Sequence, residues 1–240
     1  MIYADMHMHA LFGVDDGAET EETMLNMVDA SYRDGVRFLC LTPHYHPGYF
    51  GVHQEQIQHA YDKLFEAAKS RWQDLKLGLG NELRYDRGCV SWLQEGLCRT
   101  MNGTDYVLVD FLEDEENGRI HRALDLLLNA GYTPVLAHAE RYGRLKELDI
   151  QEFRENGIVI QVDTQSLFRG FGFFIQRRCR NLLKLRLVDL AGSDAHDLHD
   201  RPPGISEFCK AAEKLCSKNY AEAICFENAA KMFFPQQGWD

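Results

Sequence analysis

Short apolar runs alternate with longer segments of helical period along most of the chain. The apolar runs lie at residues 2–5, 38–42, 76–80, 106–110, 133–137, 159–163 and 187–192. Helical periodicity fills the intervals at 21–34, 54–70, 90–98, 119–130, 148–155 and 174–185, and further helix runs from 205 to about 232. A strand followed by a helix, repeated many times, is typical of an α/β fold with a parallel sheet.

Polar side chains capable of metal binding follow the ends of nearly all these apolar runs. The segments concerned are TPH at 42–44, GNE at 80–82, VD at 109–110, AH at 137–138 and GSDAH at 192–196. An open doubly wound sheet would also fit the alternation of elements, but a βα barrel builds its site at the carboxyl ends of its strands. The pattern therefore favours a distorted barrel of seven βα units. Because no linker divides residues 1–240, we expect a single domain.

The first run leads into Asp5-Met6-His7-Met8-His9. Side chains alternate along a strand, so both imidazoles face the same way and can share one metal ion. Such a pair is a weak signal alone, since it can also be solvent-exposed. A single aspartate or histidine at another strand end has an equally ordinary explanation as a helix cap or a hydrogen-bonded side chain. Six strand ends of this kind together are poorly explained in that way.

Several carboxylates gathered at one barrel mouth repel one another unless cations neutralise them or their pKa values rise. The sequence therefore predicts a site for more than one metal ion. Imidazole nitrogen and carboxylate oxygen without thiolate suit Mn²⁺, Fe²⁺ or Zn²⁺ better than copper or an iron–sulfur cluster. The residues themselves do not choose among those three metals.

The charge balance restricts the partners of the protein. Thirty-seven acidic residues against 26 basic ones give a formal net charge of −11, which repels nucleic acid and anionic lipid surfaces. The amino-terminal segment MIYADMHMHA lacks the apolar run of a secretory signal, and no stretch approaches the roughly 20 apolar residues of a membrane span. We expect a cytoplasmic protein that neither binds nucleic acid nor inserts into a membrane.

The seven cysteines are odd in number and form no CxxC pair, which argues against a disulfide framework and a zinc knuckle. None has an arginine six positions later to hold an anion beside it, so the spacing does not indicate a cysteine nucleophile.

The motifs HMH, TPH, GNE, AHAER and SDAH, in this order over roughly residues 3–201, resemble those of the PHP (polymerase and histidinol phosphatase) superfamily. Within it, GVDDG at 13–17 and TPHYHPG at 42–48 resemble the capsule-type bacterial protein-tyrosine phosphatases. The resemblance implies a manganese-dependent enzyme that acts on a tyrosine kinase of capsular or exopolysaccharide biosynthesis. It also implies a PHP-type barrel and attack of a metal-bound hydroxide on phosphotyrosine.

Carried over position by position, the resemblance implies two or three divalent ions, with Glu82 as a bridge between them. Manganese is expected, with iron and zinc as alternatives. The implied ligands are His7, His9, Asp16, His44, Glu82, Asp110, His138, Asp194 and His196. One position departs from the family pattern, because Asp110 stands where glutamate is usual and is one methylene shorter. A second departure is Ala139, which occupies the usual place of a proline in this motif.

Arg141 and Arg201 match two basic positions of the family, and a guanidinium offers paired donors to phosphate oxygens. Asp194 and His196 are candidates for proton transfer in addition to metal binding.

Other functions remain open at this stage. A histidinol phosphatase or another small-molecule PHP phosphoesterase would share the same ligands. An inactive metal-binding regulatory protein is an alternative of a different class. The sequence does not identify the physiological substrate, the metal used in the cell or the oligomeric state.

Overall fold

The computed structural model describes residues 1–50, 54–168 and 170–234, and its strands form two parallel sheets that curve round one axis. The first sheet has the order β1-β2-β4 and the second the order β3-β5-β6-β7-β8-β9. The strands are β1 Tyr3–Met8, β2 Val36–Leu41, β3 His44–Tyr45, β4 Lys76–Leu79, β5 Glu82–Arg84, β6 Tyr106–Asp110, β7 Thr133–Leu136, β8 Val159–Asp163 and β9 Leu190–Gly192.

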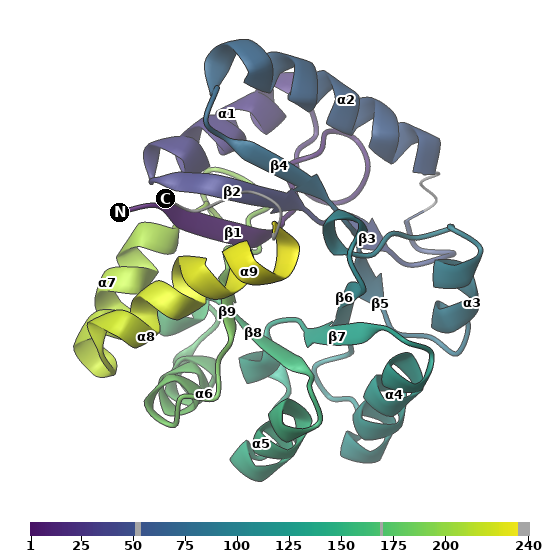
Figure 1. Ribbon diagram of the computed structural model, residues 1–240, viewed down its shortest axis with the longest axis vertical. Coiled ribbons are helices and arrows are strands. Elements are labelled where there is room, and N and C mark those ends of the chain that lie inside the picture. Colours follow the sequence, from purple (N-terminus) through teal and green to yellow (C-terminus); the bar gives the residue numbers. More distant parts are fainter. Residues whose placement is uncertain (51–53, 169, 235–240) are drawn as a thin grey trace.

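The two sheets join into one barrel because two chain segments each run through a strand of the first sheet and then a strand of the second. Each such segment, and each remaining strand, is called a stave. β2 continues into β3 across Thr42 and Pro43, and β4 continues into β5 across Gly80 and Asn81. Proline has no N–H to donate to a ladder, which accounts for the interruption after β2. Counted in this way, the described residues form seven staves, so the predicted distorted (β/α)7 barrel is confirmed (Figure 1).

Hydrogen bonds between the first strand and the segment after the last strand close the ring. The His9 amide donates to the Ala195 carbonyl at 2.9 Å, and the Asp194 amide donates to the His7 carbonyl at 2.8 Å. Gly192 lies at this seam, where a Cβ atom would meet the His7 side chain at 2.7 Å. The seam therefore brings the two ends of the predicted motif series into direct contact.

Helices surround the barrel, as Figure 1 shows. They are α1 Glu21–Arg33, α2 Gln54–Arg71, α3 Cys89–Gln94, α4 Asn117–Asn129, α5 Glu147–Glu155, α6 Phe173–Lys184, α7 Ile205–Leu215, α8 Lys218–Glu222 and α9 Asn228–Phe233. Short helical turns lie at η1 Met101–Gly103, η2 Ala139–Arg141 and η3 Thr164–Phe168, and a π-helical turn, η4, at Ala223–Glu227. Within the described ranges, no helix is both long and apolar enough to cross a membrane.

The barrel interior is apolar at one end and polar at the other. Inward-facing Met6, Phe38 and Leu108 form a core with Phe233 and Phe234, so α9 closes the end where the strands begin (Figure 1). The opposite end holds the predicted metal-binding side chains. This division leaves the carboxyl ends of the strands available for a site.

Most predicted elements are present, but the carboxyl-terminal helix differs from the expectation. The predicted helix from 205 to about 232 is divided into α7, α8, η4 and α9. Ser217 caps α8, where its hydroxyl accepts a hydrogen bond from the Tyr220 amide at 3.4 Å, so a new helix begins there. Serine favours this capping position over a helix interior. The break allows α9 to turn across the barrel end.

Candidate metal centre

All nine side chains predicted as ligands lie in three overlapping groups at the polar end of the barrel. Within each group, one ligand atom per residue lies within 4.8 Å of every other. The first group consists of His7, His9, Glu82 and Asp194, the second of His9, Asp16, His44 and His196, and the third of Glu82, Asp110 and His138. His9 belongs to two groups, and so does Glu82.

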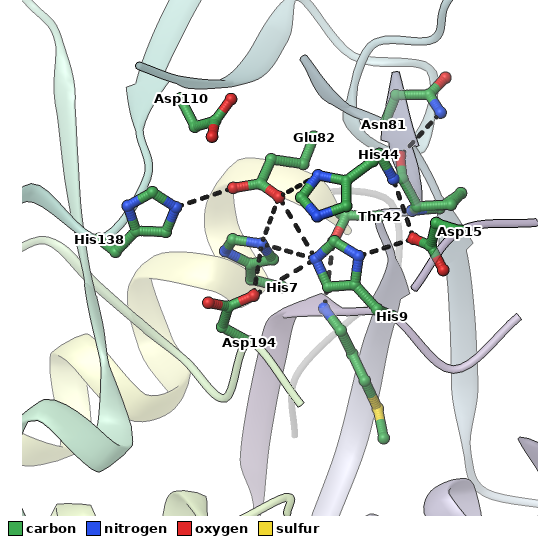
Figure 2. Close-up of polar contacts among 12 residues, drawn as sticks. His7, His9, Asp15, Thr42, His44, Asn81, Glu82, Asp110, His138 and Asp194 are labelled. Carbon is green, nitrogen blue, oxygen red and sulfur yellow. Dashed lines mark hydrogen bonds and ion pairs between the residues drawn. The ribbon is translucent and has the colours of Figure 1, made fainter. Parts of the chain in front are cut away.

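The first group has the tightest geometry. The Nε2 atoms of His7 and His9 are 3.1 Å apart, and each lies 3.4 Å from Glu82 Oε2 and 3.3 Å from Asp194 Oδ1. Four ligand atoms about 2.1 Å from one ion would be separated by about 3.4 Å in a tetrahedral arrangement. Figure 2 shows these four side chains pointing toward a common centre. The spacing therefore fits a divalent cation.

A local change of facing in β1 places the two histidines. The register with β2 is irregular between Asp5 and Met8. Met6 packs in the inner core, whereas Met8 packs in the outer core against the helices. His7 and His9 nevertheless lie together, with their Nε2 atoms 3.1 Å apart, although the regular alternation assumed from the sequence is interrupted between Asp5 and Met8.

Hydrogen bonds at Nδ1 aim the Nε2 atoms of the histidines into the groups. His9 Nδ1 donates to Asp15 Oδ2 at 2.7 Å, and His196 Nδ1 donates to the Asp194 carbonyl at 2.9 Å. His7 Nδ1 lies 3.3 Å from Gln161 Oε1, which is an acceptor because the His138 amide also donates to it. With Nδ1 protonated, Nε2 presents a lone pair, so at 3.1 Å the rings of His7 and His9 require a cation or proton between them.

Hydrogen-bond satisfaction also favours cations at this position. Among the described residues, Glu82 Oε2, Asp110 Oδ1, Asp194 Oδ1 and His196 Nε2 are buried without a hydrogen-bond partner. Buried polar atoms are nearly always paired in native proteins. All four atoms belong to the three groups, so the residues fit a set of divalent ions with mixed nitrogen and oxygen ligands.

Glu82 and Asp110 are the carboxylates of the third group, and nearby positive groups of the protein do not fully neutralise their negative charge. Burial and the neighbouring charge of Glu82 raise the pKa of Asp110 to about 7. Burial opposes ionisation of Glu82 as well, but the nearby histidines hold its pKa well below its ordinary value. His138, whose Nε2 lies 2.9 Å from Glu82 Oε1, has its pKa lowered to about 4 by burial and by the charge of Arg141. A bound cation would relieve the repulsion at Asp110.

A cavity of about 370 Å³ opens over the three groups. Members of each group line it, and so do three arginines, Arg84, Arg141 and Arg201. Arg141 Nη2 donates to Asp194 Oδ2 at 2.8 Å and also to Asp163, while Arg201 donates to the same Asp194 oxygen. Arg84 lies beside the third group, 2.9 Å from Asp110 Oδ2. The cavity thus combines cation-binding groups with donors for an anion.

Phe171 supports the two predicted arginines. Its ring centre lies 4.1 Å from the Arg141 guanidinium carbon and 6.0 Å from that of Arg201. A guanidinium over an aromatic face is attracted by the ring quadrupole and restricted in orientation. Both arginines are therefore held in place by Asp194 on one side and by Phe171 on the other.

Sequence reasoning missed several residues that position the site. Asp15 anchors His9, Gln161 links His7 with His138, and the Tyr142 hydroxyl lies 3.3 Å from His138 Nδ1. Asp163, which binds Arg141, ends a predicted strand as the ligands do, so its position was a usable signal. Nothing in the spacing distinguishes Asp15 from Asp16, because both occur in one glycine-bounded turn.

Comparison with known proteins relates the whole arrangement to a family. Residues 3–234 match the family described as capsular polysaccharide synthesis, CpsB/CapC. The tyrosine-protein phosphatase CpsB of Streptococcus agalactiae is 32% identical over 94% of this chain and 96% of its own. CpsB of Streptococcus pneumoniae is 30% identical over 97% of this chain and 98% of its own.

A solved structure agrees with this relationship. It belongs to a study of YwqE from Bacillus subtilis and CpsB from Streptococcus pneumoniae, described as metal-dependent tyrosine phosphatases. It aligns with a TM-score of 0.87 at 27% identity and covers 100% of this chain and 96% of its own. The family match over nearly the full length and the identity above 30% leave no doubt about the relationship. The chain belongs to the CpsB/CapC family of capsular polysaccharide synthesis proteins.

Proposed function

We propose that this protein is a metal-dependent protein-tyrosine phosphatase that hydrolyses the phosphate monoester of phosphotyrosine. The observation that carries the proposal is the placement of three overlapping groups of histidine and carboxylate atoms under a cavity with three arginines. Such a cavity offers Lewis-acid positions and anion donors to one phosphoryl group. The relatives named as tyrosine-protein phosphatases support this activity.

Two or three divalent ions are the proposed cofactors, with manganese ahead of iron and zinc. Three groups that share His9 and Glu82 support more than one ion, and Glu82 offers one oxygen toward the first group and the other toward His138. The ligand atoms are nitrogen and oxygen only, which agrees with all three metals. Ions bound there would polarise the phosphoryl group and make a water molecule more acidic.

The arginines are proposed to bind and orient the phosphoryl oxygens. Arg141 and Arg201 converge on a single oxygen of Asp194, so each guanidinium keeps further N–H groups for an anion. Their shared contact also holds the Asp194 carboxylate so that Oδ1 faces His7 and His9. Because these donors are fixed before substrate binds, little reorganisation accompanies the build-up of charge on phosphate.

Proton transfer is proposed to involve His196 rather than Asp194, although the sequence suggested both. Asp194 Oδ2 already accepts from two arginines, which favours its ionised form. His196 has Nδ1 fixed by a carbonyl and an unpartnered Nε2 that lies 3.3 Å from Asp16 Oδ1. With Nδ1 held by the carbonyl, the imidazole can transfer a proton only through Nε2, and only while Nε2 is not bound to a metal ion.

The cysteines offer no alternative nucleophile. None of the residues that line the cavity in the described part of the chain is a cysteine. Burial raises the pKa values of the Cys40, Cys89 and Cys98 thiols to about 12, so these groups are not thiolates near neutral pH. All seven cysteines are free. A phosphocysteine intermediate is therefore not part of the proposed mechanism.

The proposed protein substrate is a bacterial tyrosine kinase of capsule or exopolysaccharide biosynthesis, and the proposed location is the cytoplasm. Membership of a capsular polysaccharide synthesis family supports the first statement. Free cysteines are usual in a reducing compartment and support the second.

A substrate panel on metal-reconstituted protein tests the proposal. Phosphotyrosine peptides should be hydrolysed faster than phosphoserine peptides, histidinol phosphate and oligonucleotides, and a chelator should abolish turnover. Faster hydrolysis of histidinol phosphate would instead support the small-molecule alternative. Equal activity of rigorously metal-free protein would refute the metal-dependent proposal.

A further inference from the structure

The outer face of α6 carries a stripe of aromatic and basic side chains. Phe173, Arg177, Arg180 and Lys184 are all exposed and follow one another at helical spacing. Phe174 lies beside the stripe, with 79% of its surface exposed, and packs edge-on against Phe173. Large exposed aromatic residues next to one another often mark a binding surface.

The charge of this helix is opposite to that of the chain. α6 contains three arginines, one lysine and no acidic residue, whereas the whole chain has a net charge of −11. Some basic groups on other helices are paired with a carboxylate of the same helix, as Arg33 is with Asp29 on α1 and Lys69 with Glu66 on α2. Within the described parts of the chain, no carboxylate forms an ion pair with Arg177, Arg180 or Lys184. The stripe therefore presents uncompensated positive charge.

The helix is attached to the segment that carries Arg141. The remaining arginine of α6, Arg178, donates to the carbonyls of Glu140 and Leu145, both at 2.9 Å. Phe171, two residues before α6 begins, supports the guanidinium of Arg141 over its ring. The stripe thus starts beside the cavity and leads away from it.

We propose that this stripe, formed by Phe173, Arg177, Arg180 and Lys184, binds an acidic segment next to the phosphotyrosine of a polypeptide substrate. The proposal rests on the proposed function and adds a class of partner to it. From Phe173 to Lys184 the helix advances 11 steps and rises about 17 Å, the length of about five extended peptide residues. One peptide can therefore place phosphotyrosine in the cavity and acidic side chains along the stripe.

A membrane surface suits the stripe less well than a peptide. Amphipathic helices that lie on membranes insert an apolar face into the lipid. The apolar face of α6, with Cys179, Leu182 and Leu183, is buried against the barrel. The exposed large apolar residues are Phe173 and Phe174 at one end of α6 and Leu185 just after the other end, whereas the basic groups Arg177, Arg180 and Lys184 lie between them.

Charge removal on α6 tests the proposal. The triple variant Arg177→Gln, Arg180→Gln, Lys184→Gln is compared with wild type on two phosphotyrosine peptides, one flanked by glutamates and one by serines. We expect kcat/KM for the acidic peptide to fall about tenfold, since three exposed ion pairs contribute modestly each. Hydrolysis of the serine-flanked peptide and of p-nitrophenyl phosphate should stay within about twofold, because the cavity is unchanged.

A matched control removes three positive charges elsewhere. Lys63, Lys69 and Arg71 are exposed on α2, so their replacement by glutamine changes net charge equally without touching α6. We expect this variant to keep the wild-type preference for the acidic peptide. High salt should reduce the preference of the wild type, because exposed charges are screened. An equal loss in both triple variants would show a general charge effect and overturn the proposal.

Direct binding separates this proposal from the proposed function. A non-hydrolysable acidic phosphotyrosine peptide should bind wild type more tightly than the α6 variant in fluorescence anisotropy, even if the protein hydrolysed nothing. Equal affinities would overturn the docking proposal and leave phosphatase activity untouched. Two other outcomes would also overturn the docking proposal. In the first, the α6 variant loses binding to phosphatidylserine vesicles but not to the peptide. In the second, it loses self-association but not peptide binding.

Discussion

Replacing Asp15 by asparagine tests how the site aims its histidines. Asp15 Oδ2 accepts from His9 Nδ1 at 2.7 Å and from the His44 amide at 3.0 Å (Figure 2). Asp15 Oδ1 accepts from the Gly17 amide at 3.0 Å. Asparagine has one acceptor atom in place of two. In either orientation its NH₂ group faces an N–H group of the protein, so at least one of these hydrogen bonds is lost.

The expected effect is a loss of metal affinity with the fold retained. Partners of metal-binding histidines typically change metal affinity by about 10–100-fold, which corresponds to about 1.4–2.7 kcal/mol. His9 belongs to two of the three groups, so two binding steps should weaken. The third group, formed by Glu82, Asp110 and His138, should change little.

Manganese titration calorimetry together with elemental analysis would measure the effect. Asp125→Asn, an exposed aspartate on α4, is the matched control and should bind metal like the wild type. Circular dichroism of the metal-free proteins would show that the variant is folded. Unchanged affinity for every ion in folded Asp15→Asn would refute the conclusion that Asp15 fixes the ring of His9.

Three further predictions concern the third group and the arginines. Asp110→Glu should keep the fold and raise metal occupancy, whereas metal binding by Asp110→Ala equal to that of the parent would remove this residue from the ligand set. In metal-free protein the raised pKa of Asp110, about 7, means that stability is lost as pH rises from about 4 to 7. Asp110→Asn should therefore stabilise the metal-free form more at pH 8 than at pH 5 in urea unfolding, and the reverse order would contradict the assignment. Arg141→Ala should keep its metals but lose about 10²–10³ in kcat/KM, with Arg141→Lys intermediate, when both are measured on one preparation.

The fold was largely predictable because strand ends and helix periods are local signals. Each of the seven staves corresponds to an apolar run in the sequence. The observed strand boundaries differ from the predicted ones where tertiary contacts determine them. β1 reaches Met8 rather than residue 5, since its later residues pair with the barrel seam. The division of the predicted last helix depends on where α9 packs. Helical periodicity in the sequence carries no information about that contact.

The site was predictable in its ligands but not in their supports. Eight of the nine proposed ligands lie at or near a strand end, where the sequence pattern marks them, whereas Asp16 came only from the resemblance to the family, which also supplied the ligand roles. Tyr142, Gln161 and Arg84 act through hydrogen bonds or ion pairs with residues 4, 154 and 26 positions away in sequence. Such contacts depend on how staves are arranged in space. The exposed stripe on α6 was also missed, although the helix predicted at 174–185 contains Arg177, Arg180 and Lys184.

The seam between β1 and the segment after β9 imposes an order on biosynthesis. The hydrogen bond from the Ser193 amide to Asp5 Oδ1 spans 188 positions of sequence, and a ribosome needs about 10–40 s to synthesise that length. Until then His7 and His9 have no Asp194 or His196 to join, so neither of their groups exists. A nascent or truncated chain can assemble only the group around Glu82, and full metal loading therefore reports that synthesis has passed the last strand.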